Sequence, residues 1–208
     1  YGKPSLSGPT NFFIDVGPPV LTITSPAQGE YVLDTFTITG TATDGSGVIS
    51  IEVAVDGGAF APIFNGDQTS VTINHEITGL ADGSHTLTIR ALDQPTKTAL
   101  EEIQIQVDTT APTVAFSQPG EGTSVNGGII VKGSVSDANP VDYVVLRAVE
   151  ADSTVTELAT YTPSSSSFDA GSGAPFNWQK TINTANFADQ NLTFEVEATD
   201  RAGNGSAV

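Results

Sequence analysis

Aspartates at repeated intervals are the residues of this sequence best placed to do chemistry. They form two sets with matching spacing: Asp15, Asp44 and Asp93 in the first, and Asp108, Asp137 and Asp200 in the second. The corresponding members are separated by 93 (108 − 15), 93 (137 − 44) and 107 (200 − 93) positions. Carboxylate oxygens gathered at loops suit hard cations, and Ca²⁺ is the usual hard cation outside cells.

These aspartates also have a simpler interpretation, because Asp ends strands and opens turns well. Ca²⁺ takes roughly six to eight oxygen ligands, so three side chains would need backbone carbonyls and water beside them. The sequence leaves both interpretations open. Under the first, all six aspartates are candidate ligands of Ca²⁺.

Catalytic residues are hard to find. His75 and His85 are each in phase with apolar neighbours, which is typical of packed or edge residues. Glu101 and Glu102 are adjacent along an expected strand, so they point to opposite faces and cannot share acid–base work. No Gly-x-Ser-x-Gly elbow accompanies the serines. We therefore expect a protein without catalytic activity.

The aromatic residues allow two interpretations. Trp178 and Phe176 share one face of an expected strand and could form a platform for sugars. A sandwich of this size normally holds one or two large aromatics in its core, and this favours a core position for Trp178.

The composition excludes several classes of partner. The 208 residues include 24 acidic and 7 basic side chains, a net charge of −17. Such a surface repels a phosphate backbone and an anionic membrane surface, so no nucleic acid partner is expected. The absence of cysteine excludes disulfides and thiolate zinc sites. No apolar run is long enough to insert into a membrane. The start at Tyr1 indicates a processed protein or an excised fragment, and export is inferred.

Short strands account for the remaining pattern. Apolar residues alternate along several segments, such as Phe36, Ile38, Gly40 and Ala42, as in half-buried strands. Asp-Gly and Asn-Gly pairs separate these segments and supply the positive φ of tight turns. Self-similarity with a period of about 93 residues then predicts an all-β chain of two tandem immunoglobulin-like antiparallel β-sandwich domains. The expected divisions are an N-terminal strand or linker at 1–17, domain 1 at 18–108 and domain 2 at 109–208.

Two motifs carry a family resemblance. Asp-Thr-Thr-Ala-Pro-Thr-Val at 108–114 and Ala-Thr-Asp-Arg-Ala-Gly-Asn at 198–204 resemble bacterial immunoglobulin-like repeats, relatives of fibronectin type III and cadherin modules. The resemblance implies a secreted, non-catalytic structural or adhesive repeat of a cell-surface protein, with neighbouring repeats, a receptor or a glycan as partners. The alternative is a carbohydrate-binding or spacer module of a secreted polysaccharide-degrading enzyme.

The sandwich also predicts where the aspartates lie. Its strands run alternately up and down, so the end of the second strand, the end of the sixth strand and the incoming linker meet at one pole. Each set of three aspartates occupies these three places. Cadherin-like repeats bind Ca²⁺ at such a joint, and the resemblance implies the same arrangement here.

The ends of the chain suggest a further possibility. Only eight residues follow Asp200 (208 − 200), so the last strand of domain 2 is expected to be incomplete. Phe12 and Ile14 align with Ile105 and Val107 of the seventh strand of domain 1. Residues 10–16 of one molecule could therefore complete the open edge of the next, giving head-to-tail filaments. The alternative is that a longer array was cut out of register.

Overall fold

A computed structural model describes residues 8, 14–94, 97–162, 175–187 and 191–208. Their regular structure is β-strand, apart from the 3₁₀ turn η1 at Thr184–Asn186. The strands are β1 (Val20–Ser25), β2 (Glu30–Val32), β3 (Phe36–Val55), β4 (Ala61–Ile77), β5 (Gly83–Asp93), β6 (Thr98–Val107), β7 (Thr113–Gln118), β8 (Gly128–Ser136), β9 (Val141–Val149), β10 (Val155–Tyr161), β11 (Phe176–Asn183), β12 (Thr193–Asp200) and β13 (Gly205–Ala207). The all-β prediction is confirmed, and within the described ranges no helix could cross a membrane.

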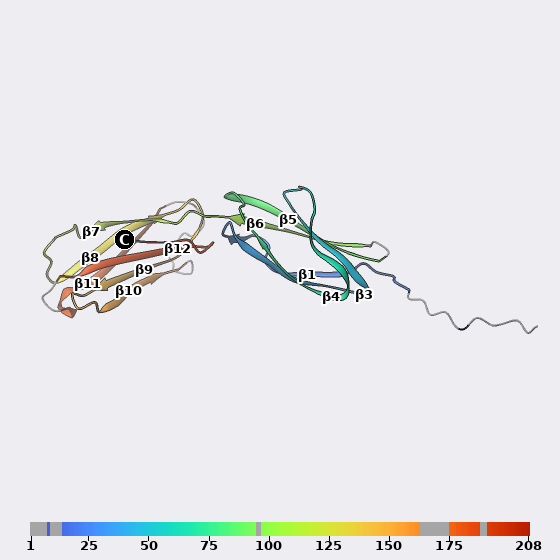
Figure 1. Cartoon of the computed structure of the whole chain (residues 1–208). Coiled ribbons are helices and arrows are strands. Elements are labelled where there is room, and N and C mark those ends of the chain that lie inside the picture. The colour runs from blue at the N-terminus through green and yellow to red at the C-terminus, as the bar shows by residue number, and fades with distance from the viewer. Residues whose placement is uncertain (1–7, 9–13, 95–96, 163–174, 188–190) are drawn as a thin grey trace, which may run out of the picture. The chain divides into compact units, whose positions relative to one another are not determined.

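The strands fall into two repeats of one plan (Figure 1). In the first repeat, β1–β6 form a sheet in the order β1-β3-β5-β6-β2, with β4 pairing β3. In the second, the three strands β11-β8-β7 form one sheet and the four strands β10-β9-β12-β13 form the other. This is the immunoglobulin-like arrangement that the alternating pattern predicts.

Strand β3 differs from the sequence prediction. We expected one strand to end at Asp44 and another to begin near Ile49, but β3 runs unbroken through both positions for 20 residues. Its first half pairs with β1, and its second half pairs with β5 from Val48 onward. The two halves thus correspond to the two expected strands, and the small residues Gly45, Ser46 and Gly47 join them. The turn that follows matches expectation, because Asp56 and Gly57 have φ of 52° and 69°.

The core of the second repeat is built around Trp178. Its side chain is 1% exposed and meets Phe116 edge to face, with ring centroids 5.2 Å apart. Val131, Leu146 and Val196 are fully buried in the same cluster. The prediction that Trp178 belongs to the core is therefore confirmed.

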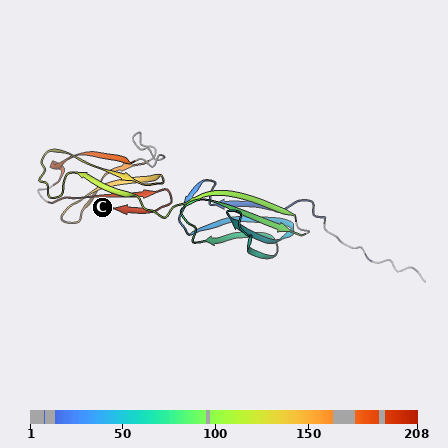
Figure 2. The same ribbon diagram turned by 90° about the horizontal axis from the view of Figure 1, so that it is seen from above.

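The last strand of the second repeat is short. Figure 2 shows the red C-terminal end of the chain returning beside β12. β13 has 3 residues, against 10 in β6. It pairs with Glu197–Thr199, and Val196 and Val208 then exchange backbone hydrogen bonds of 2.9 and 3.0 Å.

The chain divides into two compact units. The first contains the described residues up to Gly29 together with Thr37–Ile77 and Ser84–Ile105, and the second contains Glu30–Phe36, Thr78–Gly83 and Gln106–Val208. No strand occupies the proline-containing segments before β1 and before β7, as we predicted for linkers. The domain limits 18–108 and 109–208 stay a prediction.

Two glycines at equivalent positions set the distance between neighbouring strands. A Cβ on Gly40 would lie 2.2 Å from the carbonyl oxygen of Thr22, and one on Gly133 would lie 2.1 Å from that of Ala115. Both pairs follow the same spacing of 93 (133 − 40; 115 − 22). Glycine is therefore required here by the close approach of β1 to β3 and of β7 to β8.

Replacing Gly133 by alanine tests this constraint. The new Cβ would also lie 2.3 Å from Cζ2 of Trp178, so β7 or the core must shift. We expect Gly133→Ala to lower the free energy of unfolding of the second repeat by about 1–3 kcal/mol. Urea unfolding followed by the fluorescence of Trp178, the single tryptophan, measures it. Gly128→Ala in the same strand is the control, because nothing lies within 4 Å of its Cβ position. Equal effects of the two substitutions would contradict the prediction.

Candidate metal centre

Each predicted aspartate lies where its loop bonds back to the carboxylate. In the linker positions, the N–H of Gly17 donates to Oδ1 of Asp15 at 3.3 Å, and that of Thr110 donates to Oδ1 of Asp108 at 3.1 Å. Both bonds join a residue to the one two positions before it, as in an Asx turn. One carboxylate oxygen is thereby fixed and the other is left for further contacts.

The second members of the sets share the same turn. The N–H of Ser46 donates to Asp44, and the N–H of Asn139 donates to Asp137, both at 2.7 Å. Ser46 adds a hydroxyl bond of 2.6 Å to the same Asp44 oxygen.

The third members, Asp93 and Asp200, end β5 in the first repeat and β12 in the second, and each bonds to the loop that follows. The N–H of Lys97 donates to Asp93 at 2.7 Å, and the N–H of Asn204 donates to Asp200 at 2.9 Å. In return, the backbone N–H of Asp93 donates to the carbonyl oxygen of Lys97 at 3.1 Å, and that of Asp200 donates to the carbonyl oxygen of Asn204 at 3.0 Å. The predicted correspondence between the two sets is thus matched turn by turn.

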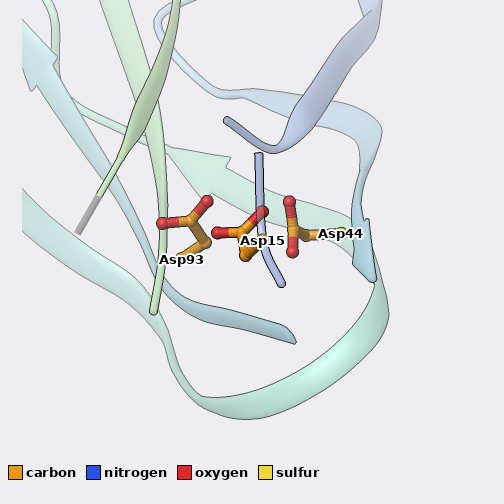
Figure 3. A group of neighbouring side chains, drawn as sticks. All are labelled: Asp15, Asp44 and Asp93. Carbon is orange, nitrogen blue, oxygen red and sulfur yellow. The ribbon is translucent and has the colours of Figure 1, made fainter. Parts of the chain in front are cut away.

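The first set converges, as its predicted place at one pole of the sandwich requires. Figure 3 shows Asp15 lying between Asp93 and Asp44. One carboxylate oxygen from each lies within 4.8 Å of the others. Asp93 is fully buried, and its Oδ2 has no hydrogen-bond partner among the described residues.

Lys97 introduces a positive charge into this first cluster. Its Nζ lies 2.8 Å from Oδ2 of Asp15 and 2.9 Å from the carbonyl oxygen of Asp15. The carbonyl oxygen of Gly17 is a third acceptor at 3.5 Å. The hydrogen bond from Lys97 holds the pKa of Asp15 below its usual value, with further help from the Gly17 N–H and against the opposing effect of burial.

The second set is more deeply buried. Asp108 and Asp200 are 1% and 2% exposed. Oδ2 of Asp108 and Oδ2 of Asp137 are buried and accept no hydrogen bond from the described part of the chain. Burial raises the pKa of Asp108, and the charges of Asp200 and Asp137 raise it further. Burial also raises the pKa of Asp137, again with a contribution from the charge of Asp200. Both pKa shifts include repulsion between these carboxylates in a desolvated place. Among the described residues, however, only the first set brings one carboxylate oxygen of each aspartate within 4.8 Å of the others.

Cationic partners are found elsewhere. Ion pairs in the described ranges include Arg90 with Glu52, Lys97 with Asp15, and Arg147 with Glu197, and His85 contacts Asp56. Asn204 instead contributes a neutral amide to the second cluster. Its Nδ2 donates to Oδ2 of Asp200 at 2.8 Å and to the carbonyl oxygen of Asp108 at 3.0 Å.

These donors fit a hard cation. Carboxylate oxygens are the donor type that Ca²⁺ prefers, with carbonyls and water completing its shell. Among the described residues, one buried carboxylate oxygen of the first cluster and two of the second have no hydrogen-bond partner. No sulfur or imidazole competes, since cysteine is absent and both histidines lie outside the clusters. Binding of Ca²⁺ stays a prediction.

The sequence analysis missed Lys97 and Asn204. Their spacing could have identified them, because Lys97 stands four positions after Asp93 at the end of β5 and Asn204 stands four positions after Asp200 at the end of β12 (97 − 93; 204 − 200). The predicted strand donors are less well placed for a test. Phe12 lies outside the described residues, and Ile14 is 70% exposed with no strand assigned to it.

Comparison with known proteins agrees with the strand arrangement. Residues 19–89 match the family model described as Bacterial Ig domain. Over these residues the first repeat is similar to a bacterial Ig domain. The match begins after Asp15 and ends before Asp93, so only Asp44 of the first cluster lies inside it.

Two relatives extend the likeness beyond the first repeat. Halomucin of Haloquadratum walsbyi (strain DSM 16790 / HBSQ001) is 28% identical over 137 residues, which are 66% of this chain and 2% of halomucin. The chain therefore spans a very small part of that relative. The fibronectin(III)-like modules of Clostridium thermocellum CbhA align over 90% of this chain and 89% of theirs, with a TM-score of 0.54 and 19% identity. This second likeness shows that the two-repeat fold is shared.

Neutralising one buried carboxylate tests whether the second cluster is under repulsion. In the presence of a chelator, we expect Asp137→Asn to raise the free energy of unfolding of the second repeat by about 1 kcal/mol. Asparagine keeps an oxygen for the Asn139 N–H and removes one of three like charges. Thermal unfolding followed by Trp178 fluorescence measures it. Asp152→Asn, at an exposed turn, is the control. A destabilised Asp137→Asn protein in chelator would contradict the prediction.

Proposed function

We propose that this chain is a non-catalytic, extracellular structural module, whose carboxylate clusters bind divalent cations and so stiffen an array of tandem repeats. The observation that supports the proposal is in the second cluster, where Oδ2 of Asp108 and Oδ2 of Asp137 are buried without a partner among the described residues, and where Nδ2 of Asn204 bonds both Asp200 and the carbonyl oxygen of Asp108. Burying unpaired charge is strongly unfavourable, and a bound cation would offset that cost.

Ca²⁺ is the cation that this donor set supports best. It accepts irregular shells of oxygen ligands and tolerates several carbonyls and waters, whereas Mg²⁺ demands a near-ideal octahedron. Sites in extracellular modules bind Ca²⁺ at about 10⁻⁴–10⁻³ M, so a few carboxylates are enough. The net charge of −17 also concentrates cations around the whole chain.

A cation in such a cluster would restrain the linker. Asp15 and Asp108 precede the first strand of each repeat, while the other two ligands stand at strand ends. Binding all three at once would fix the direction in which the chain enters the repeat. The linker after Asp108 has further restraints, because Thr109 donates to Oδ1 of Asp82 through its N–H at 3.0 Å and through its hydroxyl at 2.8 Å.

The accessory-module alternative has less support. A carbohydrate platform on a sheet needs exposed aromatic rings, and every aromatic residue in the described ranges is buried or half-buried. Trp178, the best candidate by sequence, is in the core. We therefore favour the structural repeat, with neighbouring repeats or other copies of the chain as its partners.

The cation hypothesis predicts that Ca²⁺ raises the melting temperature of the protein. A ligand that binds the folded state alone, at ten times its dissociation constant, adds about 1.4 kcal/mol. This corresponds to a rise of several degrees for a repeat of this size. Calorimetry in Ca²⁺ and then in excess chelator measures it, and Asp137→Ala should lose the shift of the second repeat. An unchanged wild-type melting temperature would contradict cation binding.

Head-to-tail strand donation stays a prediction with its own test. If residues 10–16 complete the sheet edge beside β13 in another copy, removing residues 1–14 should abolish assemblies larger than one chain. Analytical ultracentrifugation at increasing concentration measures this. The truncation keeps Asp15, so the first cluster is preserved. Assemblies of unchanged size would show that this segment is not the linkage.

A further inference from the structure

The two clusters have the same backbone but different residues at one decisive position. Lys97 and Asn204 each follow the strand-ending aspartate by four residues and make the same two backbone bonds with it. Their side chains also reach the same place. Nζ of Lys97 donates to the carbonyl oxygen of Asp15 at 2.9 Å, and Nδ2 of Asn204 donates to the carbonyl oxygen of Asp108 at 3.0 Å.

We infer that Lys97 is the built-in cation of the first cluster, so that the second cluster alone takes a divalent cation. The inference rests on the proposed function, because it assigns cation binding to one of the two clusters. The residue four positions after the strand-ending aspartate decides which cluster is open.

Contacts of Lys97 are those expected of a bound cation. Its ammonium is a compact charge with three donors, and it has three oxygen acceptors: Oδ2 of Asp15, the carbonyl oxygen of Asp15 and the carbonyl oxygen of Gly17. A divalent ion held by Asp15 would use the same oxygens. It would have to displace the ammonium or remain beside it against strong repulsion.

Compact geometry in the first cluster has the same explanation. Three carboxylates with oxygens within 4.8 Å of one another look like an open metal site when they are considered alone. The ammonium of Lys97, 2.8 Å from Asp15, offsets part of their repulsion. Because a positive charge is already present, the short separation of the oxygens does not require a metal ion. One oxygen of this cluster, Oδ2 of Asp93, stays buried without a hydrogen-bond partner among the described residues, against two in the second cluster.

The second cluster lacks this compensation. Asn204 offers a neutral amide to Oδ2 of Asp200 and leaves Oδ2 of Asp108 and Oδ2 of Asp137 without a partner in the described residues. Asp108 is 1% exposed, so water screens its charge poorly. The side-chain oxygen of Asn204 is an additional neutral ligand type that Ca²⁺ accepts.

Exchanging the two residues tests the inference. Equilibrium dialysis of the full chain against radioactive Ca²⁺ counts bound ions, and melting in Ca²⁺ and in chelator follows each repeat. We expect one ion per wild-type chain, two for Lys97→Asn and none for Asn204→Lys. The double exchange should return to one ion, now with the Ca²⁺-dependent shift outside the repeat that Trp178 reports. Lys180→Asn, a lysine of β11 away from both clusters, is the matched control and should bind one.

Each result has a distinct meaning. Two ions on the wild-type chain, or one on Lys97→Asn, would overturn the inference and leave the proposed cation function intact. No ion on the wild-type chain would instead overturn cation binding itself. If Asn204→Lys fails to fold by circular dichroism, the count for Lys97→Asn still decides, because that change only transfers the side chain of the second loop to the first.

Discussion

Repulsion between aspartates held together by their own loops is the constraint on which the site depends. A turn in which a backbone N–H donates to the carboxylate two or four residues before it fixes each side chain. These hydrogen bonds prevent the carboxylates from turning toward water. Some positive group must then offset their charge, or the repeat is less stable than it could be.

The sheets supply the rigidity that makes this possible. Gly40 lets β1 lie against β3, and Gly133 lets β7 lie against β8, more closely than any other residue would allow. The close pairing of β7 with β8 positions the chain immediately after Asp108, and the pairing of β9 with β12 positions the end that carries Asp200. Backbone pairing that continues to Asp200 and to Ser136, beside Asp137, therefore helps to determine how near the carboxylates come.

The two repeats meet the same electrostatic requirement by different means. The first has the ammonium of Lys97 inside its own cluster, and the second has the neutral amide of Asn204 in the equivalent place. A tethered cation makes the entry of the linker independent of the surroundings. If the second cluster binds cations as proposed, the entry of its linker depends on the cations available outside the chain.

Sequence alone determined the class of fold and the identity of the six aspartates. The spacings of 93 and 107 residues survive in the structure because each repeat is one sandwich, whose strand ends must meet at the same pole whatever the loops between them. Alternation predicted the strands, since successive side chains of a strand point to opposite faces. The one or two large aromatics expected in the core of a sandwich of this size placed Trp178 there.

Tertiary structure alone decided what each cluster contains. Nothing in the order of residues shows that the ammonium of Lys97 reaches back 82 positions to Asp15, because that contact depends on how the loop after β5 folds over the linker. The unbroken course of β3 is likewise a matter of which neighbours its two halves find. Long-range contacts depend on all of the intervening packing, and so the partner of a buried charge is hard to predict from the sequence alone.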